Sequence, residues 1–182
     1  MKKPTLYCKN RQEWRKWLEK NHNKKKVIWL IYYKKHSNKP RIPYNDAVEE
    51  AICFGWIDST VNAIDKDSFM QRFSPRNPKS NWSELNKERA RRMIKEGRMT
   101  KYGLEKLNGT HEKKYKLSKE VLKELKKDKE TWQNFQKFPE HYKTIRVAWI
   151  DDAKEIPEMY KKRLSYFLKK TKKNERFGML EE

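Results

Sequence analysis

Hydrophobic positions near the start of the chain follow first a helical and then a strand spacing. Trp14, Trp17 and Leu18 fall on one face of a helix, because residues three and four apart share a face. The run 27–33 is β-branched and aromatic on both faces and is too short for a typical helix. The pattern therefore predicts an amphipathic helix followed by a buried strand.

A second helix and a hairpin follow. Helical spacing returns from Tyr44 to Ile52, and Gly55 marks the end of that helix. Residues 56–64 and 68–74 alternate in the manner of two strands joined by a turn at 65–67. Since the run 27–33 can join them, we expect an α+β fold with a small antiparallel sheet of three strands packed with helices, followed by a helical C-terminal part.

The rest of the chain is predicted to be helical. Ser80 or Asn81 is expected to cap a third helix that carries Trp82 and ends at Gly97. A polar, basic stretch then precedes apolar stripes of helical spacing. The sequence predicts three parts: an α+β core domain at 1–109, a linker at 110–116, and a helical C-terminal region with a basic tail at 117–182.

The composition points to a polyanionic partner without defining one. Charged residues make up 39% of the chain and hydrophobic residues 35%, and seven Trp, nine Tyr and seven Phe supply a core of large rings. The formal net charge of +21 favours nucleic acid first and an anionic membrane surface second. The base composition of an AT-rich genome also produces such lysine runs, and both interpretations stay open.

Cysteine usage and the lack of long apolar stretches suggest a reducing compartment. Cys8 and Cys53 are far apart and lack CxxC spacing, so two reduced thiols are expected. No stretch approaches the roughly 18 apolar residues of a membrane helix, and no apolar segment follows Lys2 and Lys3. We therefore expect a cytoplasmic protein with no membrane span.

The segment from Arg72 to Ser80 is the first candidate site. Arg72 and Arg76 precede Lys79 and Ser80 at an expected helix start, where free amides favour an anion such as phosphate. The alternative is structural: Arg72 pairs with Asp58 of the neighbouring strand, and Ser80 is only a helix cap. Both interpretations stay open at this point.

A pocket around Asp58, Trp82 and Asn86 is the second candidate. Asp58 is a possible buried carboxylate with a shifted pKa, and Asn86 is expected on the helical face of Trp82. The alternatives are an ordinary ion pair for Asp58 and an interior hydrogen bond for Asn86. The four histidines are scattered, so we assign no catalytic residue, no metal ligand and no cofactor.

Several strings in the chain are similar to one protein family. EWRKWLEKNH, VIWLIYYKK, AVEEAICFGWIDS, SFMQRFSPRNPKSNWSELN and EGRMTKYG occur in order, followed by WIDDAK. Together they resemble the YdeI/OmpD-associated, or bacteriocin-protection, family over most of residues 5–168. Members usually carry Glu-Thr-Arg soon after the Ala-Lys pair, whereas here Ala153-Lys154 is followed by Glu155-Ile156-Pro157. The resemblance implies a role in envelope stress or bacteriocin resistance and assigns no catalytic residues.

The functional expectation combines this resemblance with the charge. We expect a non-enzymatic, cytoplasmic stress or bacteriocin-resistance factor that binds an anionic ligand, with phosphate-bearing molecules or nucleic acid as partners. A nucleic-acid-binding module is the alternative supported by charge. An enzyme with a pocket around Asp58, Arg72 and Asn86 is the second alternative.

Overall fold

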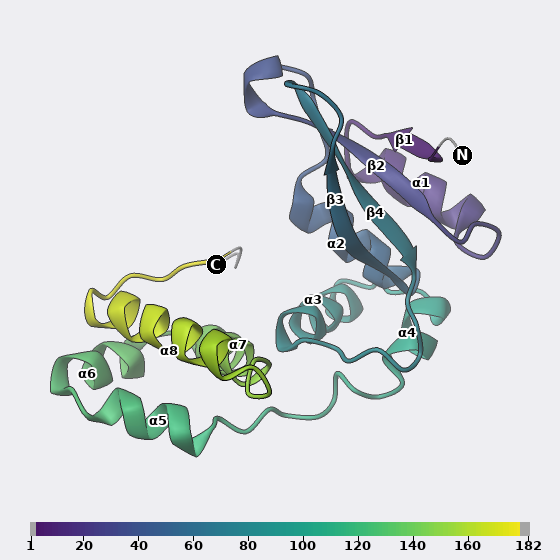
Figure 1. Ribbon diagram of the computed structural model, residues 1–182. Helices are drawn as coiled ribbons and strands as arrows, with labels where there is room; N and C mark the ends of the chain where they lie inside the picture. Colours follow the sequence, from purple (N-terminus) through teal and green to yellow (C-terminus); the bar gives the residue numbers. More distant parts are fainter. Residues whose placement is uncertain (1–2, 179–182) are drawn as a thin grey trace. The chain divides into compact units, whose positions relative to one another are not determined.

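The computed structural model describes residues 3–178, which form two compact units (Figure 1). The sheet unit comprises the residues up to Asn81 together with Arg89–His111, and the helical unit comprises Trp82–Glu88 together with the residues from Glu112 onward. The strands are β1 (Thr5–Tyr7), β2 (Ile28–Tyr33), β3 (Trp56–Ala63) and β4 (Ser68–Pro75). The helices are α1 (Arg11–Asn21), α2 (Tyr44–Cys53), α3 (Glu84–Lys95), α4 (Lys101–Leu107), α5 (Lys119–Lys126), α6 (Lys129–Lys137), α7 (Glu140–Asp151) and α8 (Pro157–Lys172), with a 3₁₀ turn at Lys35–Ser37.

The sheet has four strands in the order β1-β2-β4-β3, and it is mixed rather than antiparallel. β2 pairs antiparallel with β4, and β4 pairs antiparallel with β3, as the hairpin pattern predicts. The prediction of three antiparallel strands is wrong about the edge, where β1 runs parallel to β2. β1 has only three residues, which is too short to show an alternating pattern, so its place depends entirely on the pairing with β2.

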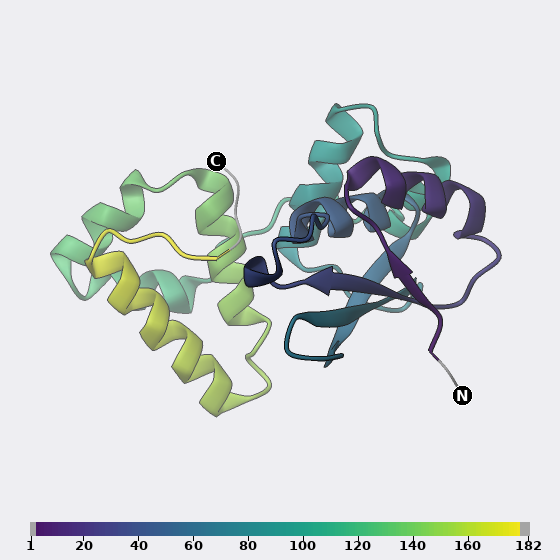
Figure 2. The same ribbon diagram turned by 90° about the horizontal axis from the view of Figure 1, so that it is seen from above.

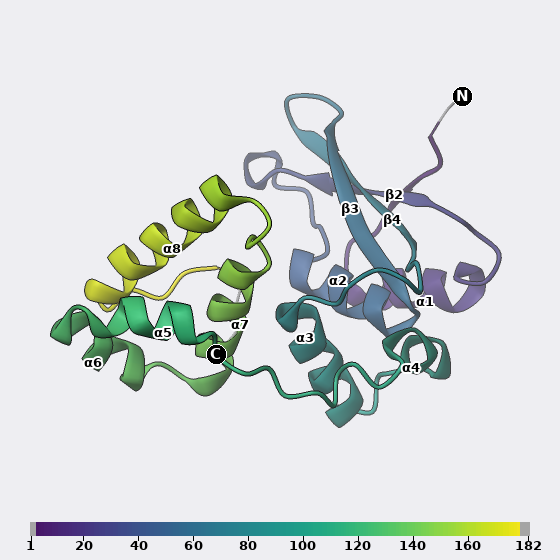
Figure 3. The ribbon, with the colours of Figure 1, turned by 60° about the horizontal axis from the view of Figure 1, so that its bottom comes forward.

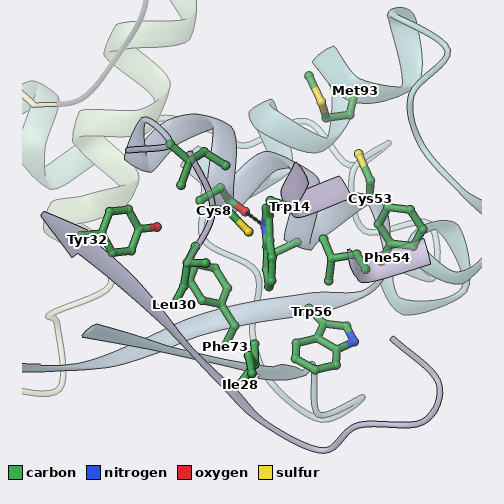
Figure 4. Packing of buried hydrophobic residues seen from close by; sticks show 14 residues of the cluster. Cys8, Trp14, Ile28, Leu30, Tyr32, Cys53, Phe54, Trp56, Phe73 and Met93 are labelled. Carbon is green, nitrogen blue, oxygen red and sulfur yellow. Dashed lines mark hydrogen bonds between the residues drawn. The ribbon is translucent and has the colours of Figure 1, made fainter. Parts of the chain in front are cut away.

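The core of the sheet unit lies between the sheet and the helices on one of its faces (Figure 2). Trp14 of α1 is fully buried at its centre, beside Cys8, Phe73 and Trp56 (Figure 4). Its indole Nε1 donates to the carbonyl oxygen of Ala47 in α2 at 3.0 Å, which satisfies the one polar atom of the ring. Burial of this stripe fixes α1 and α2 against β2 and β4.

The start of α3 differs from the sequence prediction. Ser83, rather than Ser80 or Asn81, caps the helix, since its Oγ accepts the backbone N–H of Asn86 at 3.3 Å. Ser80 instead closes a turn, in which its N–H and Oγ both donate to the carbonyl oxygen of Asn77, at 3.0 and 2.7 Å. The Oγ of Ser80 is thus engaged in this turn and does not cap α3. Trp82 therefore precedes the helix and does not share a helical face with Asn86.

The helical unit has its own core, formed where α8 contacts α6 and α7 (Figure 3). Phe135, Tyr142 and Phe167 are buried in it. Phe177, beyond the end of α8, packs its ring against those of Tyr166 and Trp149, with centroid distances of 4.8 and 5.8 Å. The helical C-terminal part predicted from the apolar stripes is confirmed. Across residues 3–178, none of the helices is both long and apolar enough to cross a membrane.

Candidate functional site

Arg72 and Asp58 lie on opposite faces of the sheet. Arg72 is opposite Trp29 of β2, and Asp58 is opposite Phe73 of β4, the next residue along that strand. Because successive side chains of a strand point to opposite faces, the two cannot pair across the strands. Arg72 instead donates from Nη1 to the Oγ of Ser74 at 3.0 Å. The structural alternative of an Arg72–Asp58 ion pair is therefore wrong.

Arg76, the expected main contact for an anion, is an interior side chain. It is 3% exposed, and its Nη2 donates to the carbonyl oxygen of Asn81. Burial lowers its pKa to about 10, against the opposing effect of the Asp58 carboxylate. Lys79 is exposed, and its N–H donates to Oδ1 of Asn77 in the turn that also contains Ser80. Anion binding by Arg72, Arg76, Lys79 and Ser80 stays a prediction.

Asp58 is the centre of a hydrogen-bonded polar cluster in the sheet unit. Its Oδ2 accepts from the hydroxyl of Tyr44 at 2.9 Å and from Nε2 of Gln71 at 2.8 Å. Burial raises the pKa of Tyr44 to about 12, and the charge of Asp58 acts in the same direction. Trp82 and Asn86 belong to the helical unit. A pocket shared by Asp58, Trp82 and Asn86 stays a prediction.

Two buried carboxylates of α2 hold a cluster of arginines that sequence reasoning did not single out. Glu49 is 2% exposed and Glu50 is fully buried. Glu50 accepts from Arg11 Nε at 2.6 Å and Arg15 Nη1 at 2.7 Å, and it also pairs with Arg98. Burial favours the neutral acid, but the hydrogen bonds of the arginines outweigh it and lower the pKa of Glu50. The mutual pairing marks a structural network rather than a ligand site.

A small pocket lies within the helical unit, between the first turn of α3 and one side of α7. Its volume is about 110 Å³, and its lining consists of Ser83, Glu84, Leu85, Ile145, Arg146, Trp149 and Asp152. The lining thus combines apolar residues with one arginine and two acidic residues. Apolar walls with a few polar groups are typical of small-ligand sites.

Arg146 is a buried residue of this pocket, and it has no counter-ion within the part of the chain that the structure describes. It is 7% exposed, and within the described residues its Nε has no hydrogen-bond partner. The guanidinium lies over the rings of Phe177 and Tyr142, at 4.8 and 5.6 Å from their centroids. Burial lowers its pKa, and among the described residues only the charge of Tyr142 opposes this shift. Aromatic rings offset part of the desolvation cost, but they cannot neutralise a buried cation.

The sequence carries a signal for Arg146. Arg146 interrupts the apolar run from Ile145 to Trp149, in which the four remaining side chains are all hydrophobic. The same holds for Glu49 and Glu50, which lie between Val48 and Ala51. A charge inside an apolar stripe is rarely buried unless it is paired or bound to something. Such a charge therefore indicates either an ion-pair network or a ligand contact.

Metal and thiol chemistry find no support in the described part of the chain. There, no three His, Cys, Asp or Glu side chains are grouped to hold a metal ion. Cys8 and Cys53 are both free and buried, and burial raises the pKa of each thiol to about 12. Protonated, buried thiols are poor nucleophiles. Of the sites described, the pocket at Arg146 is the one suited to bind a small ligand.

Comparison with protein families gives two matches that follow one another along the chain. Residues 6–106 match the family described as Domain of unknown function (DUF8412). Residues 114–174 match the family described as Bacteriocin-protection, YdeI or OmpD-Associated. Comparisons with curated proteins and with solved structures give no match. The pocket residues Ile145, Arg146, Trp149 and Asp152 lie inside the second match.

Proposed function

Since the chain belongs to the DUF8412 family and its residues 114–174 belong to the bacteriocin-protection, YdeI or OmpD-associated family, we propose that it is a non-enzymatic bacteriocin-protection and stress-resistance factor that binds an anionic ligand. The family expected from the sequence is confirmed for 114–174, which includes WIDDAK. The other strings that carry the resemblance lie between Glu13 and Gly103, inside the DUF8412 match.

The observation that carries the proposal is that Arg146, whose guanidinium is buried, lines the pocket. An isolated charge that loses its hydration costs several kcal/mol unless a counter-charge replaces the lost water. A phosphate or carboxylate bound in the pocket supplies that counter-charge through charge-assisted hydrogen bonds. The position of Arg146 within the bacteriocin-protection match links this chemistry to the family.

The proposed compartment is the cytoplasm. The support comes from the two cysteines, which are free and buried. Reduced, unpaired thiols are usual where glutathione and thioredoxin keep cysteines reduced. A fractionation experiment with an antibody against the chain tests this part of the proposal independently of ligand binding.

Binding of small anions to variants of Arg146 tests the proposal. Titration calorimetry with inorganic phosphate and with butyrate is expected to give saturable binding to the unaltered protein. Arg146→Gln should weaken binding at least about tenfold, because one charge-assisted hydrogen bond is worth about 1.5 kcal/mol or more. Arg146→Lys keeps the charge and should retain part of the affinity, which separates a binding defect from a folding defect.

Lys126→Gln is the matched control. Its ammonium lies over the ring of Trp132 at 5.0 Å, as the guanidinium of Arg146 lies over that of Phe177, but Lys126 is exposed and does not line the pocket. It is expected to leave anion affinity within about twofold of the unaltered protein. Absence of saturable binding, or equal binding by Arg146→Gln, would contradict the proposal. In cells, Arg146→Gln should lose bacteriocin protection that Lys126→Gln retains.

The segment from Arg72 to Ser80 is proposed as a further anion contact. The exposed ammonium of Lys79 supports it. Because Arg76 is buried and donates to Asn81, its replacement by Ala is expected to lower stability as well as binding. Lys79→Ala and Arg72→Ala are therefore the informative variants, and each should weaken phosphate binding without changing the melting temperature by more than about 2 °C.

A nucleic-acid-binding module is the second candidate, and the composition of one sheet face favours it. Trp29, Tyr33 and Arg72 lie on the face opposite Phe73 and the core. Lys3 lies over the ring of Trp29 at 4.4 Å and Lys39 over that of Tyr33 at 4.5 Å. Trp29 is only 8% exposed, so Tyr33, Lys39 and Arg72 form the accessible part of this face. An accessible aromatic ring with basic neighbours is typical of proteins that stack single-stranded bases.

A further inference from the structure

The pocket at Arg146 has a negative end as well as a positive one. Asp152 lines the same cavity, and within the described residues its carboxylate forms no hydrogen bond or ion pair. Desolvation raises the pKa of Asp152; the charges of Arg163 and Lys87 oppose this shift, whereas those of Asp151 and Glu84 add to it. Glu84, which also lines the pocket, pairs with Lys87. Asp152 is exposed, so its carboxylate lies at the open, solvent-facing end of the pocket.

The positive and negative ends are held apart by the helix that carries them. Arg146 lies within α7 and Asp152 directly follows the end of that helix, so the two are six positions apart along the chain. At 1.5 Å per residue this amounts to roughly 9 Å along the axis. Trp149 comes between them, three positions from each, and together with Ile145 it lines the pocket. Arg146 and Asp152 form no ion pair with one another, and neither charge acts on the pKa of the other.

A ligand with a single charge suits this arrangement poorly. A simple anion bound by Arg146 brings a second negative charge close to Asp152 and Glu84, and these carboxylates repel it. A simple cation bound by Asp152 leaves the guanidinium of Arg146 without a counter-ion. A molecule that carries both charges, separated by a short apolar segment, satisfies both ends.

We infer that the ligand of this pocket is a small amino carboxylate, whose carboxylate binds Arg146, whose ammonium binds Asp152 and whose methylene chain packs on Trp149. The inference rests on the proposed function, because it names the class of anionic ligand that the same pocket takes. The volume of about 110 Å³ limits the ligand to a few carbon atoms. The separation of the charges favours an ω-amino acid over an α-amino acid.

A series of probes with matched chain length tests the inference by titration calorimetry. The probes are glycine, β-alanine, γ-aminobutyrate and δ-aminovalerate, each compared with the carboxylate that lacks the amine: acetate, propionate, butyrate and valerate. The best amino carboxylate is expected to bind about tenfold more tightly than its partner, which is the value of one charge-assisted contact. Butylamine should bind much more weakly than either.

Variants at the two ends separate the contributions. Asp152→Asn should remove the advantage of the amine and leave butyrate affinity unchanged or higher, whereas Arg146→Gln should weaken binding of both probes at least about tenfold. Glu155→Gln is the control, because Glu155 is exposed and does not line the pocket. Circular dichroism and melting temperature establish that each variant is folded.

The possible failures are distinguishable. If butyrate and γ-aminobutyrate bind equally and Asp152→Asn changes neither, the inference is wrong and the proposed function stands. If no carboxylate of either series binds, the proposed function falls as well. If butylamine binds to Arg146→Gln as tightly as γ-aminobutyrate binds to the unaltered protein, the pocket is a cation site and both are overturned.

Discussion

At the scale of single residues, charge inside the protein follows two different rules. Glu50 is fully buried, yet it stays ionised because Arg11, Arg15 and Arg98 surround its carboxylate. Arg146 is buried without such a partner among the described residues. The first arrangement is self-sufficient and holds α1 against α2. The second lacks a counter-charge. We therefore interpret the Glu50 network as structural and Arg146 as a ligand contact.

Glu50→Gln is expected to lower the free energy of unfolding by about 3 kcal/mol. The substitution leaves three guanidinium groups without their shared counter-ion, and breaking a buried pair by removing one partner costs about 3–5 kcal/mol. We expect a value near the lower end of this range, because the arginine side chains are 21–34% exposed and water can partly solvate them. Urea denaturation measures the change. Glu19→Gln, at a carboxylate 49% exposed that pairs with Arg15 on the surface, is the control and should cost less than about 0.5 kcal/mol.

The same carboxylate makes stability depend on pH in a defined direction. The pKa of Glu50 is lowered in the folded state relative to its ordinary value of 4.5, so the folded chain releases that proton more readily than the unfolded one. Its contribution is complete above about pH 4.5 and is lost as the pH falls through the folded pKa. The difference between Glu50→Gln and the unaltered protein should therefore shrink below pH 4.5. A constant difference between about pH 6 and pH 3 would show that folding does not lower the pKa of Glu50.

At the scale of elements, the first turn of α3 decides where the candidate pocket forms. The helix begins at Glu84 because Ser83 supplies the cap, and this places Ser83, Glu84 and Leu85 along the pocket wall. A helix starting after Ser80 would turn different side chains toward α7. The cap therefore connects a local sequence choice to the geometry of the binding site.

Ser83→Ala is expected to destabilise the protein by about 1 kcal/mol, since it removes the Oγ that accepts the backbone N–H of Asn86 and caps the helix. Ser80→Ala provides the matched control. Ser80 only closes a surface turn with Asn77, so its loss should change stability by less than about 0.5 kcal/mol. Thermal unfolding of both variants distinguishes the two positions. A larger effect at Ser80 would place the cap where the sequence pattern alone expected it.

The elements that periodicity predicts well are those with a strong local pattern. The stripe of Trp14 and Leu18 and the alternating hairpin strands are clear in the sequence, because each buries a regular face. β1 could not be found this way, since three residues carry no periodicity and their pairing with β2 is non-local. The sequence also does not show that Ser83 rather than Ser80 caps α3, because two serines three residues apart are equivalent cap signals.

The candidate site was less predictable than the fold. The sequence drew attention to Arg72 and Arg76, which are close along the chain, although a strand and a turn carry them to different surroundings. Arg146 meets Ser83 only through packing of α7 against residues more than fifty positions earlier in the chain. Local charge patterns do not reveal such contacts. The sequence signal that does indicate such a site is a charged residue within an apolar stripe, as at Arg146.

At the scale of the whole molecule, the net charge of +21 creates a second way to bind anions. Diffuse lysines such as Lys24, Lys25 and Lys26 are exposed and attract any polyanion through screened, long-range forces. The pocket at Arg146 instead needs a ligand that fits about 110 Å³. The two modes respond differently to salt and to mutation, so they can be measured separately in the same protein.

Binding of oligo-dT at a series of salt concentrations is expected to weaken steeply, with a slope in log–log form of about −0.7 for each phosphate neutralised. The reason is counterion release, which depends on the number of basic contacts and not on the pocket. Replacing Lys24, Lys25 and Lys26 with Gln should make the slope shallower, whereas Arg146→Gln should change it little. Binding of γ-aminobutyrate, which carries no net charge, should hardly respond to salt. Oligo-dT affinity that persists at about 0.5 M salt would instead favour the nucleic-acid-binding module, and loss of oligo-dT binding in Arg146→Gln would make the pocket a phosphate contact.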